Sequence, residues 1–127
     1  MLNGHLEPAT ELLGIARFKI HDGKLEEFKR LSAQCMEIVR TRDTGTLQYN
    51  IYISDDQSEC IVVERYTDSE ALSEHLAHLG GDLMQAISAT GSISGELLGE
   101  PSAELRAKLA GSEQPRLFTP LFSRGQP

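Results

Sequence analysis

The fold is decided by the stretch from Thr46 to Leu76, TLQYNIYISDDQSECIVVERYTDSEALSEHL. Residues 46–53 and 60–66 within it are rich in β-branched and aromatic side chains, and a polar segment separates them. Two β-rich runs joined by a short polar loop predict a β-hairpin. The elements on either side of the hairpin can be assigned from it.

A helix is expected directly after the hairpin. Thr67 and Glu70 match a capping box, which predicts that the helix begins at Thr67. Gly80 and Gly81 interrupt the helical pattern, and residues 82–89 can form a further short helical piece. One face of the first piece carries Ala71, Leu72, His75, Leu76 and Leu79 at helical spacing.

A strand and a helix are expected before the hairpin. Residues 12–20 alternate with a period of two, which predicts a strand. Asp22 is a suitable N-cap for an amphipathic helix over residues 25–42, and the sequence Asp43-Thr44-Gly45 is a stop signal.

Three weaker elements are expected after the second helix. Residues 92–99 predict a strand that Gly95 weakens, and residues 101–109 predict a short helix. Residues 116–122 are apolar, but their flanking prolines favour an edge strand or an extended arm.

The order β-α-β-β-α-β predicts an α+β fold of the ferredoxin-like type, with an antiparallel sheet. A short C-terminal helix and an edge strand complete it. We expect residues 1–11 to be a flexible leader. Residues 12–127 are expected to form one domain, which includes the C-terminal helix and arm (101–127).

Composition excludes several classes of function. The 127 residues carry a net charge of -7, which disfavours nucleic acid and acidic membrane surfaces as partners. No window approaches the length of apolar sequence that a membrane helix needs. Cys35 and Cys60 lack CxxC spacing, which is typical of free thiols in a reducing compartment. The protein is therefore expected to be cytoplasmic.

The strands are apolar on both sides, although two helices can cover only one face of a sheet. An uncovered face of this kind would be a large hydrophobic patch, so a homodimer is expected. The apolar arm, residues 116–122, either crosses to the partner or covers the sheet of its own chain in a monomer. In residues 46–53, one side of the strand carries Leu47, Tyr49, Ile51 and Ile53, and the other side carries Gln48, Asn50 and Tyr52. In residues 60–66, one side carries Ile61 and Val63, and the other side carries Val62 and Tyr66.

Three segments in this order, DGKLEEF (22–28), TGTLQYNIYISDD (44–56) and IVVERYTDSEALSEHL (61–76), resemble the antibiotic biosynthesis monooxygenase (ABM) family. The resemblance implies a dimeric α+β barrel with a pocket between the sheet and the helices. Some members of the family oxidise aromatic or quinol substrates with molecular oxygen and use no metal or flavin. Others degrade haem or act as isomerases, so the fold does not define the reaction.

His75 is the first candidate for chemistry, because an imidazole in a half-apolar pocket can take a proton from a phenol. The alternative is a structural histidine bonded to the backbone or to Glu64. The family often has a second histidine where this chain has Gly80, whereas His78 is present here. His75 and His78 lie near one helical face, but no further ligand matches a metal motif, and no metal site is expected.

A second group lies on the hairpin. Asn50 and Tyr52 share one face of the first strand, and Glu64 and Tyr66 share one face of the second. Such groups either line a wet pocket that holds a substrate and its developing oxyanion, or pair across the strands at a dimer interface. Tyr66 stands where many family members have tryptophan.

The leading hypothesis is a cofactor-independent monooxygenase that acts on a small aromatic or quinol-like molecule. A non-catalytic small-molecule-binding or interaction dimer and an isomerase are the alternatives, so enzymatic activity is left open. No cofactor is expected. The expected site has His75 as catalytic base or orienting group and substrate-binding residues Asn50, Tyr52, Glu64, Tyr66 and His78.

Overall fold

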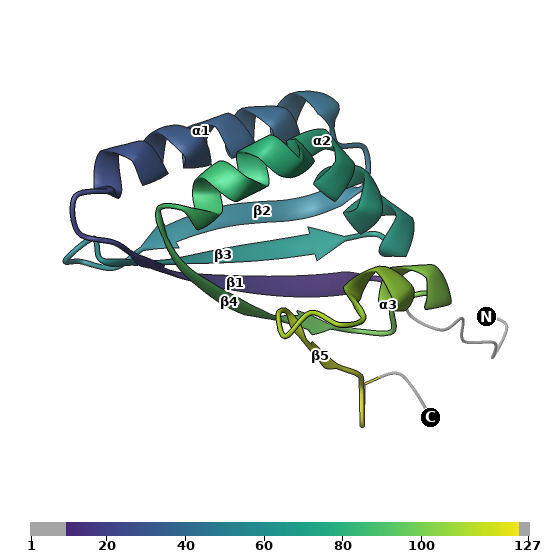
Figure 1. Cartoon of the computed structure of the whole chain (residues 1–127). Helices are drawn as coiled ribbons and strands as arrows, with labels where there is room; N and C mark the ends of the chain where they lie inside the picture. Colours follow the sequence, from purple (N-terminus) through teal and green to yellow (C-terminus); the bar gives the residue numbers. More distant parts are fainter. Residues whose placement is uncertain (1–9, 125–127) are drawn as a thin grey trace, which may run out of the picture.

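The computed structural model describes residues 10–124. The first nine residues of the expected leader and residues 125–127 of the expected domain lie outside this range. Figure 1 shows two long helices on one side of a sheet, with a smaller C-terminal unit beside it. The elements are β1 (Leu12–Ile20), α1 (Leu25–Arg42), β2 (Thr46–Ile53), β3 (Glu59–Tyr66), α2 (Ser69–Ser88), β4 (Gly91–Leu98), α3 (Ala103–Leu109) and β5 (Arg116–Phe118).

The sheet has the strand order β2-β3-β1-β4-β5, and all neighbours are antiparallel except β4 and β5. The first four strands with α1 and α2 form the predicted ferredoxin-like α+β arrangement, which is confirmed. None of the described helices is long and apolar enough to span a bilayer.

Two predicted helix caps are wrong. Helix α1 has Lys24 at its N-cap and no side-chain cap, so Asp22 lies two residues too early. In α2 the cap is Asp68, whose carboxylate accepts a 2.8 Å hydrogen bond from the amide of Ala71. Thr67 instead continues the β3 end, where its amide donates to the carbonyl of Gly45. Both errors are shifts of one or two residues along the chain, because the local sequence does not define the turn that leads into each helix.

The predicted interruption at Gly80 is present as a kink inside α2. Gly80 has φ 77° and ψ 158°, a conformation that other residues adopt only with strain. Residues on the two sides of the kink thus pack in different core clusters: Leu72 packs with Tyr66 of β3, and Leu83 packs with Leu31 of α1.

The core lies between the helices and the sheet. Phe28 of α1 packs on Cys60 and Val62 of β3, and α3 completes the other end through Leu105, which is 1% exposed. Cys35 and Cys60 are free thiols and are buried.

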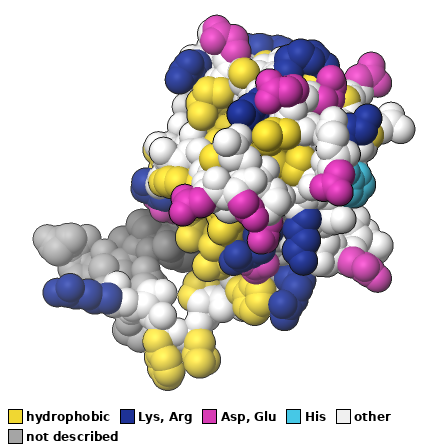
Figure 2. Space-filling model, turned by 90° about the vertical axis from the view of Figure 1, so that its left-hand side faces the viewer, with side chains coloured by type: hydrophobic (Ala, Val, Ile, Leu, Met, Phe, Trp, Pro, Cys, Tyr) yellow, Lys and Arg dark blue, Asp and Glu magenta, His cyan; other side chains and the backbone are white. Residues whose placement is uncertain are grey.

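The opposite face of the sheet has no helix over it (Figure 1). Tyr52 and Ile61 on this face are 54% and 38% exposed, but Arg17 and Glu96 form a 3.1 Å ion pair there as well. In the side view of Figure 2 hydrophobic side chains likewise lie among charged ones and continue toward the lower edge of the molecule. A β-bulge between Thr46 and Gln48 disturbs the simple alternation that the sequence suggests for β2.

The C-terminal arm pairs with its own chain. Residues Arg116–Phe118 run parallel to Glu96–Leu98 of β4, so this part of the arm is an edge strand, as one of the sequence expectations has it. It extends the sheet and does not cover its helix-free face. Leu121 and Phe122 beyond it are 85% and 92% exposed.

Candidate active site

A buried aspartate–histidine pair lies where the end of α1 meets α2. Asp43 follows the last residue of α1, and its Oδ2 lies 2.7 Å from Nδ1 of His75 on α2. The two side chains are 1% and 2% exposed. Because Nδ1 donates to the carboxylate, the neutral imidazole carries its lone pair on Nε2, the nitrogen that a general base uses.

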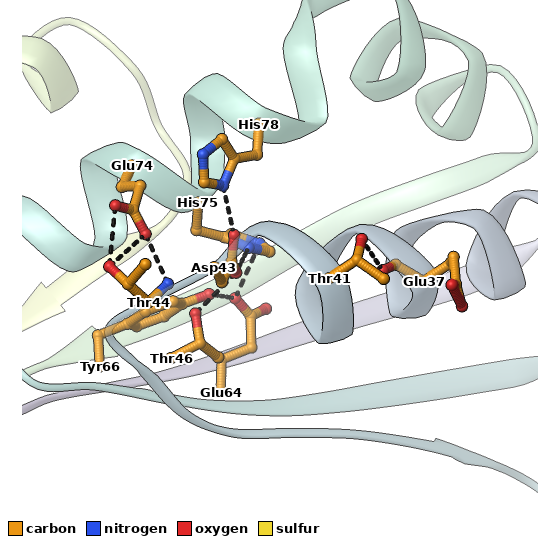
Figure 3. Close-up of polar contacts among 10 residues, drawn as sticks. All are labelled: Glu37, Thr41, Asp43, Thr44, Thr46, Glu64, Tyr66, Glu74, His75 and His78. Carbon is orange, nitrogen blue, oxygen red and sulfur yellow. Dashed lines mark hydrogen bonds and ion pairs between the residues drawn. The ribbon is translucent and has the colours of Figure 1, made fainter.

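The same carboxylate accepts two more hydrogen bonds. His78 Nδ1 lies 2.7 Å from Asp43 Oδ1, and the hydroxyl of Thr46 donates to Oδ2 at 2.7 Å (Figure 3). Burial acts to raise the pKa of Asp43, but the hydrogen bonds from His78, Thr46 and His75 together hold it below its ordinary value. Asp43 is therefore ionised at neutral pH and holds both imidazole rings.

The position of Asp43 is electrostatically unfavourable without these partners. An anion at the C-terminus of a helix faces the negative end of the helix dipole. Arg40 and Arg42 occupy the last turn of α1, but the described contacts of the Asp43 carboxylate are with His75, His78 and Thr46. Such a violation of a local rule, compensated by tertiary contacts, is typical of a functional site.

A carboxyl group faces His75 from the sheet. Glu64 Oε1 lies 4.0 Å from His75 Nε2, beyond hydrogen-bonding distance, and accepts a hydrogen bond from the hydroxyl of Tyr66. Burial raises the pKa of Glu64, and the hydrogen bond from Tyr66 opposes this only in part. The pKa of the Tyr66 hydroxyl is also raised by its burial and by Glu64. A proton acceptor and a potential proton donor thus face each other.

His75 borders a cavity of about 190 Å³ between α2, α1 and the sheet. The ring centroid of His75 lies 5.3 Å from that of Tyr49 and 5.5 Å from that of Tyr66. Met84 and Ile93 also line the cavity and are 41% and 40% exposed. They mark its opening between the second half of α2 and β4. The remaining wall is mainly apolar: Ala16, Phe18, Val62, Leu76, Leu79 and Ile87.

The expected site residues separate into two groups. His75, Glu64 and Tyr66 lie together on the helix side of the sheet, and His78 reaches the same cluster through Asp43 (Figure 3). Asn50 and Tyr52 are exposed on the helix-free face. The structure therefore does not bring them to the cavity, because alternate residues of β2 point to opposite faces.

Sequence reasoning missed Asp43, Thr46 and Tyr49. The sequence identifies Asp43 only as part of a helix stop, although an acidic residue directly after a basic last turn is a recognisable signal. Its partner His75 is separated from it by 32 residues, so the contact exists only in the folded chain. Tyr49 reads in the sequence as an ordinary apolar strand residue.

Among the described residues, one trio could hold a metal ion. Asp43, Glu74 and His78 offer ligand atoms that lie within 4.8 Å of one another. Both carboxylates are already used: Asp43 accepts from the two histidines, and Glu74 accepts from the amide of Thr44 at 2.8 Å and from its hydroxyl. An ion at this place has to replace those hydrogen bonds.

The cysteine near the cavity is not set up as a nucleophile. Cys35 lines the same cavity as Tyr49, and burial raises the pKa of its thiol to about 11. Only a very small fraction is thiolate at neutral pH, and the thiolate is the reactive form. Cys35 is therefore not the reactive group of this site. The chemistry that the arrangement can perform is proton transfer through His75 and Glu64.

Fold and site together define a ferredoxin-like α+β protein with a buried acid–base cluster under its second helix. The chain belongs to the antibiotic biosynthesis monooxygenase family, whose model matches residues 13–89. No curated protein matches the chain.

Solved structures share the fold. MupZ from Pseudomonas fluorescens is 24% identical over 95% of this chain and 95% of that chain, with a TM-score of 0.71. SnoaB, a cofactor-independent oxygenase from Streptomyces nogalater, is 22% identical over 70% of this chain and 91% of its own, with a TM-score of 0.60. A putative antibiotic biosynthesis monooxygenase from Caulobacter crescentus CB15 is 22% identical over 70% and 88%, with a TM-score of 0.59.

Proposed function

We propose that this protein is a cofactor-independent monooxygenase that acts on a small aromatic or quinol-like molecule, with His75 as its general base. The observation that carries the proposal is the buried Asp43–His75 pair, whose free Nε2 borders a cavity and faces Glu64. Its family membership supports the reaction class.

The residues have distinct roles in this proposal. Asp43 orients His75 and stabilises the imidazolium that forms when Nε2 takes a proton from an acidic O–H or C–H of the substrate. The resulting anion gives electrons to molecular oxygen. For a CH₂ group the balance is R₂CH₂ + O₂ → R₂C=O + H₂O. Burial raises the pKa of Glu64, which favours its protonated form, and in that form the carboxyl group, held by Tyr66, donates a hydrogen bond to the developing oxyanion.

An oxygen electrode tests the proposal. A panel of quinols and anthrones should be consumed faster with the parent protein than with His75→Ala, by about 10²-fold or more if His75 is the base. His21→Ala is the matched control, since His21 is exposed and far from the cluster in its contacts. Equal oxygen consumption by the parent and His75→Ala rejects His75 as the base.

An isomerase is the second candidate, and the facing acid and base favour it. Proton removal by His75 and proton delivery by Glu64 at another carbon would shift a double bond without oxygen. Anaerobic exchange of substrate hydrogen for solvent deuterium, with no oxygen consumption in air, distinguishes this reaction. Binding of a panel member with neither exchange nor oxygen uptake supports the non-catalytic alternative.

The homodimer and the cytoplasmic location are also proposals. A second copy that covers the helix-free face would bury Tyr52 and Ile61, and a stable interface needs about 800 Å² per partner. Light scattering of the dilute protein measures the mass, and a monomer mass excludes this assembly. The free thiols of Cys35 and Cys60 support a reducing compartment.

A further inference from the structure

A second cavity adjoins the one at His75. Its volume is about 230 Å³, and it shares Ala16, Glu64, Leu76 and Ile93 with the first cavity. Glu64 therefore stands at the boundary between the two. We call this second cavity the tail compartment. The residues that line it and not the first cavity are Gly14, Ile15, Tyr66, Leu72, Ser94, Gly95, Glu96, Leu97, Leu109, Gln114 and Pro115.

The C-terminal segment forms the outer side of the tail compartment. Leu109 ends α3, whose Leu105 is 1% exposed in the core, and Lys108 Nζ lies 3.4 Å from Ser73 Oγ on α2. Gln114 Oε1 accepts a 2.9 Å hydrogen bond from the amide of Gly95 in β4. The wall is thus attached to both the helix layer and the sheet. The C-terminal residues of the wall, Leu109, Gln114 and Pro115, lie outside residues 13–89, which the family model matches.

The chemistry of this wall selects an apolar occupant. Glu64 at the boundary is bonded to Tyr66, and the side-chain oxygen of Gln114 is occupied by Gly95. Ser94 and Glu96 also line the cavity, and the Glu96 carboxylate is paired with Arg17. The other side chains of the wall are mostly hydrocarbon, so a polar group placed against them would lose its water without a partner. The ionisable part of a ligand belongs at His75, and its apolar part belongs in the tail compartment.

Size separates the two parts further. An apolar cavity of about 150 Å³ is enough for benzene. The cavity at His75 therefore has room for one aromatic ring. The tail compartment can take roughly seven or eight further groups of the size of water, at about 30 Å³ each.

We propose that the substrate is a phenol- or quinol-like head with an alkyl or acyl chain, and that the tail compartment binds the chain. The assignment of the head to His75 rests on the proposed function; the binding of the chain does not. The C-terminal segment thereby makes this protein selective for long, apolar substrates.

Binding of 4-n-alkylphenols, from methyl to hexyl, tests the proposal by calorimetry without turnover. The dissociation constant should fall about fourfold per added methylene, since each buried methylene contributes about 0.8 kcal/mol. A profile that is flat beyond ethyl overturns the proposal. So does a rigid three-ring phenol that binds more tightly than every alkylphenol.

Variants of α3 locate the chain. Leu109→Trp fills the tail compartment and should weaken 4-hexylphenol at least tenfold while leaving 4-methylphenol unchanged. Ala107→Trp is the matched control, because Ala107 is exposed on the same helix. Leu109→Ala enlarges the compartment, so the dissociation constant should continue to fall with added methylenes up to a longer chain than in the parent. This variant keeps the test valid if the tryptophan variant does not fold. An unchanged chain-length profile in both Leu109 variants overturns the proposal.

The outcomes for chain and chemistry are separable. A chain-length effect without oxygen uptake or proton exchange retains the tail compartment and rejects the proposed reaction. Oxygen uptake with short phenols and no chain-length effect retains the reaction and rejects the tail compartment.

Discussion

Replacing Asp43 by asparagine should lower the free energy of unfolding by about 3 kcal/mol at neutral pH. The substitution preserves the shape of the side chain and removes its charge. The carboxylate accepts hydrogen bonds from His75, His78 and Thr46 and is 1% exposed, so solvent does not replace what is lost.

The magnitude follows from those three contacts. A hydrogen bond to a charged group contributes about 1.5–3 kcal/mol, roughly twice the value for a neutral one. Asparagine retains a neutral acceptor, so about 1 kcal/mol is lost per bond and about 3 kcal/mol in total. An amide nitrogen facing Nδ1 of His75 also favours the wrong tautomer, which should reduce turnover by at least about 10²-fold.

The pH dependence identifies the group. The pKa of Asp43 is lowered in the folded protein, whereas in the unfolded chain it is about 3.9. The ionised form is therefore stabilised by folding, and its contribution is present above pH 3.9 and is lost as the pH falls through the folded pKa. Because Asp43→Asn has no carboxyl group to protonate, this part of the loss of stability at low pH (the acid limb of the profile) should be absent from the variant. Glu11 and Asp56, whose pKa values are also lowered, retain theirs.

Urea unfolding between pH 2.5 and pH 7, followed by circular dichroism, measures both effects. Asp55→Asn is the control, because Asp55 is an exposed aspartate of the hairpin loop. A loss below about 0.5 kcal/mol, or parallel pH profiles for the parent and Asp43→Asn, refutes the reasoning that the carboxylate is ionised and holds both rings.

Further predictions concern the neighbours of this carboxylate. The pKa of Glu64 is raised by burial, so the free energy of unfolding of the parent should fall as the pH rises from about 4.3 toward the folded pKa. In urea titrations Glu64→Gln should remove this fall, whereas Glu59→Gln, at an exposed residue, should not. His78→Gln should shift the acid limb to higher pH, because its hydrogen bond lowers the pKa of the aspartate; His21→Gln is the control, and an unshifted limb contradicts the assignment. Tyr66→Phe should lower the free energy of unfolding, measured by thermal unfolding, by about 1–2 kcal/mol, since it removes the donor to a buried carboxyl group. An unchanged free energy of unfolding would mean that water replaces the hydroxyl.

The elements were predictable wherever periodicity was strong. The hairpin, the amphipathic α1 and the break at Gly80 follow from side-chain spacing and from backbone freedom, which are local properties. The predicted caps at Asp22 and Thr67 are wrong because the turn before each helix decides which residue is the N-cap. That residue is Lys24, without a side-chain bond, in α1 and Asp68 in α2.

The site was predictable only in part. His75 could be identified as a histidine on an apolar helical face, and Glu64 and Tyr66 as polar groups sharing one strand face. Asn50 and Tyr52 do not lie with them, and to predict this from the sequence one has to know which side of β2 faces the helices. A period of two divides a strand into faces but does not say which face is covered when both carry apolar residues.

The linear sequence determined the order of elements, the α+β class and a histidine on the apolar face of the second helix, because periodicity and turn chemistry act over a few residues. Only the tertiary structure decided that Asp43 holds His75, since the two approach each other when α1 and α2 pack on one face. It also decided that the C-terminal segment encloses a second cavity next to Glu64. Both depend on contacts between residues far apart in the chain, and local spacing carries no information on such contacts.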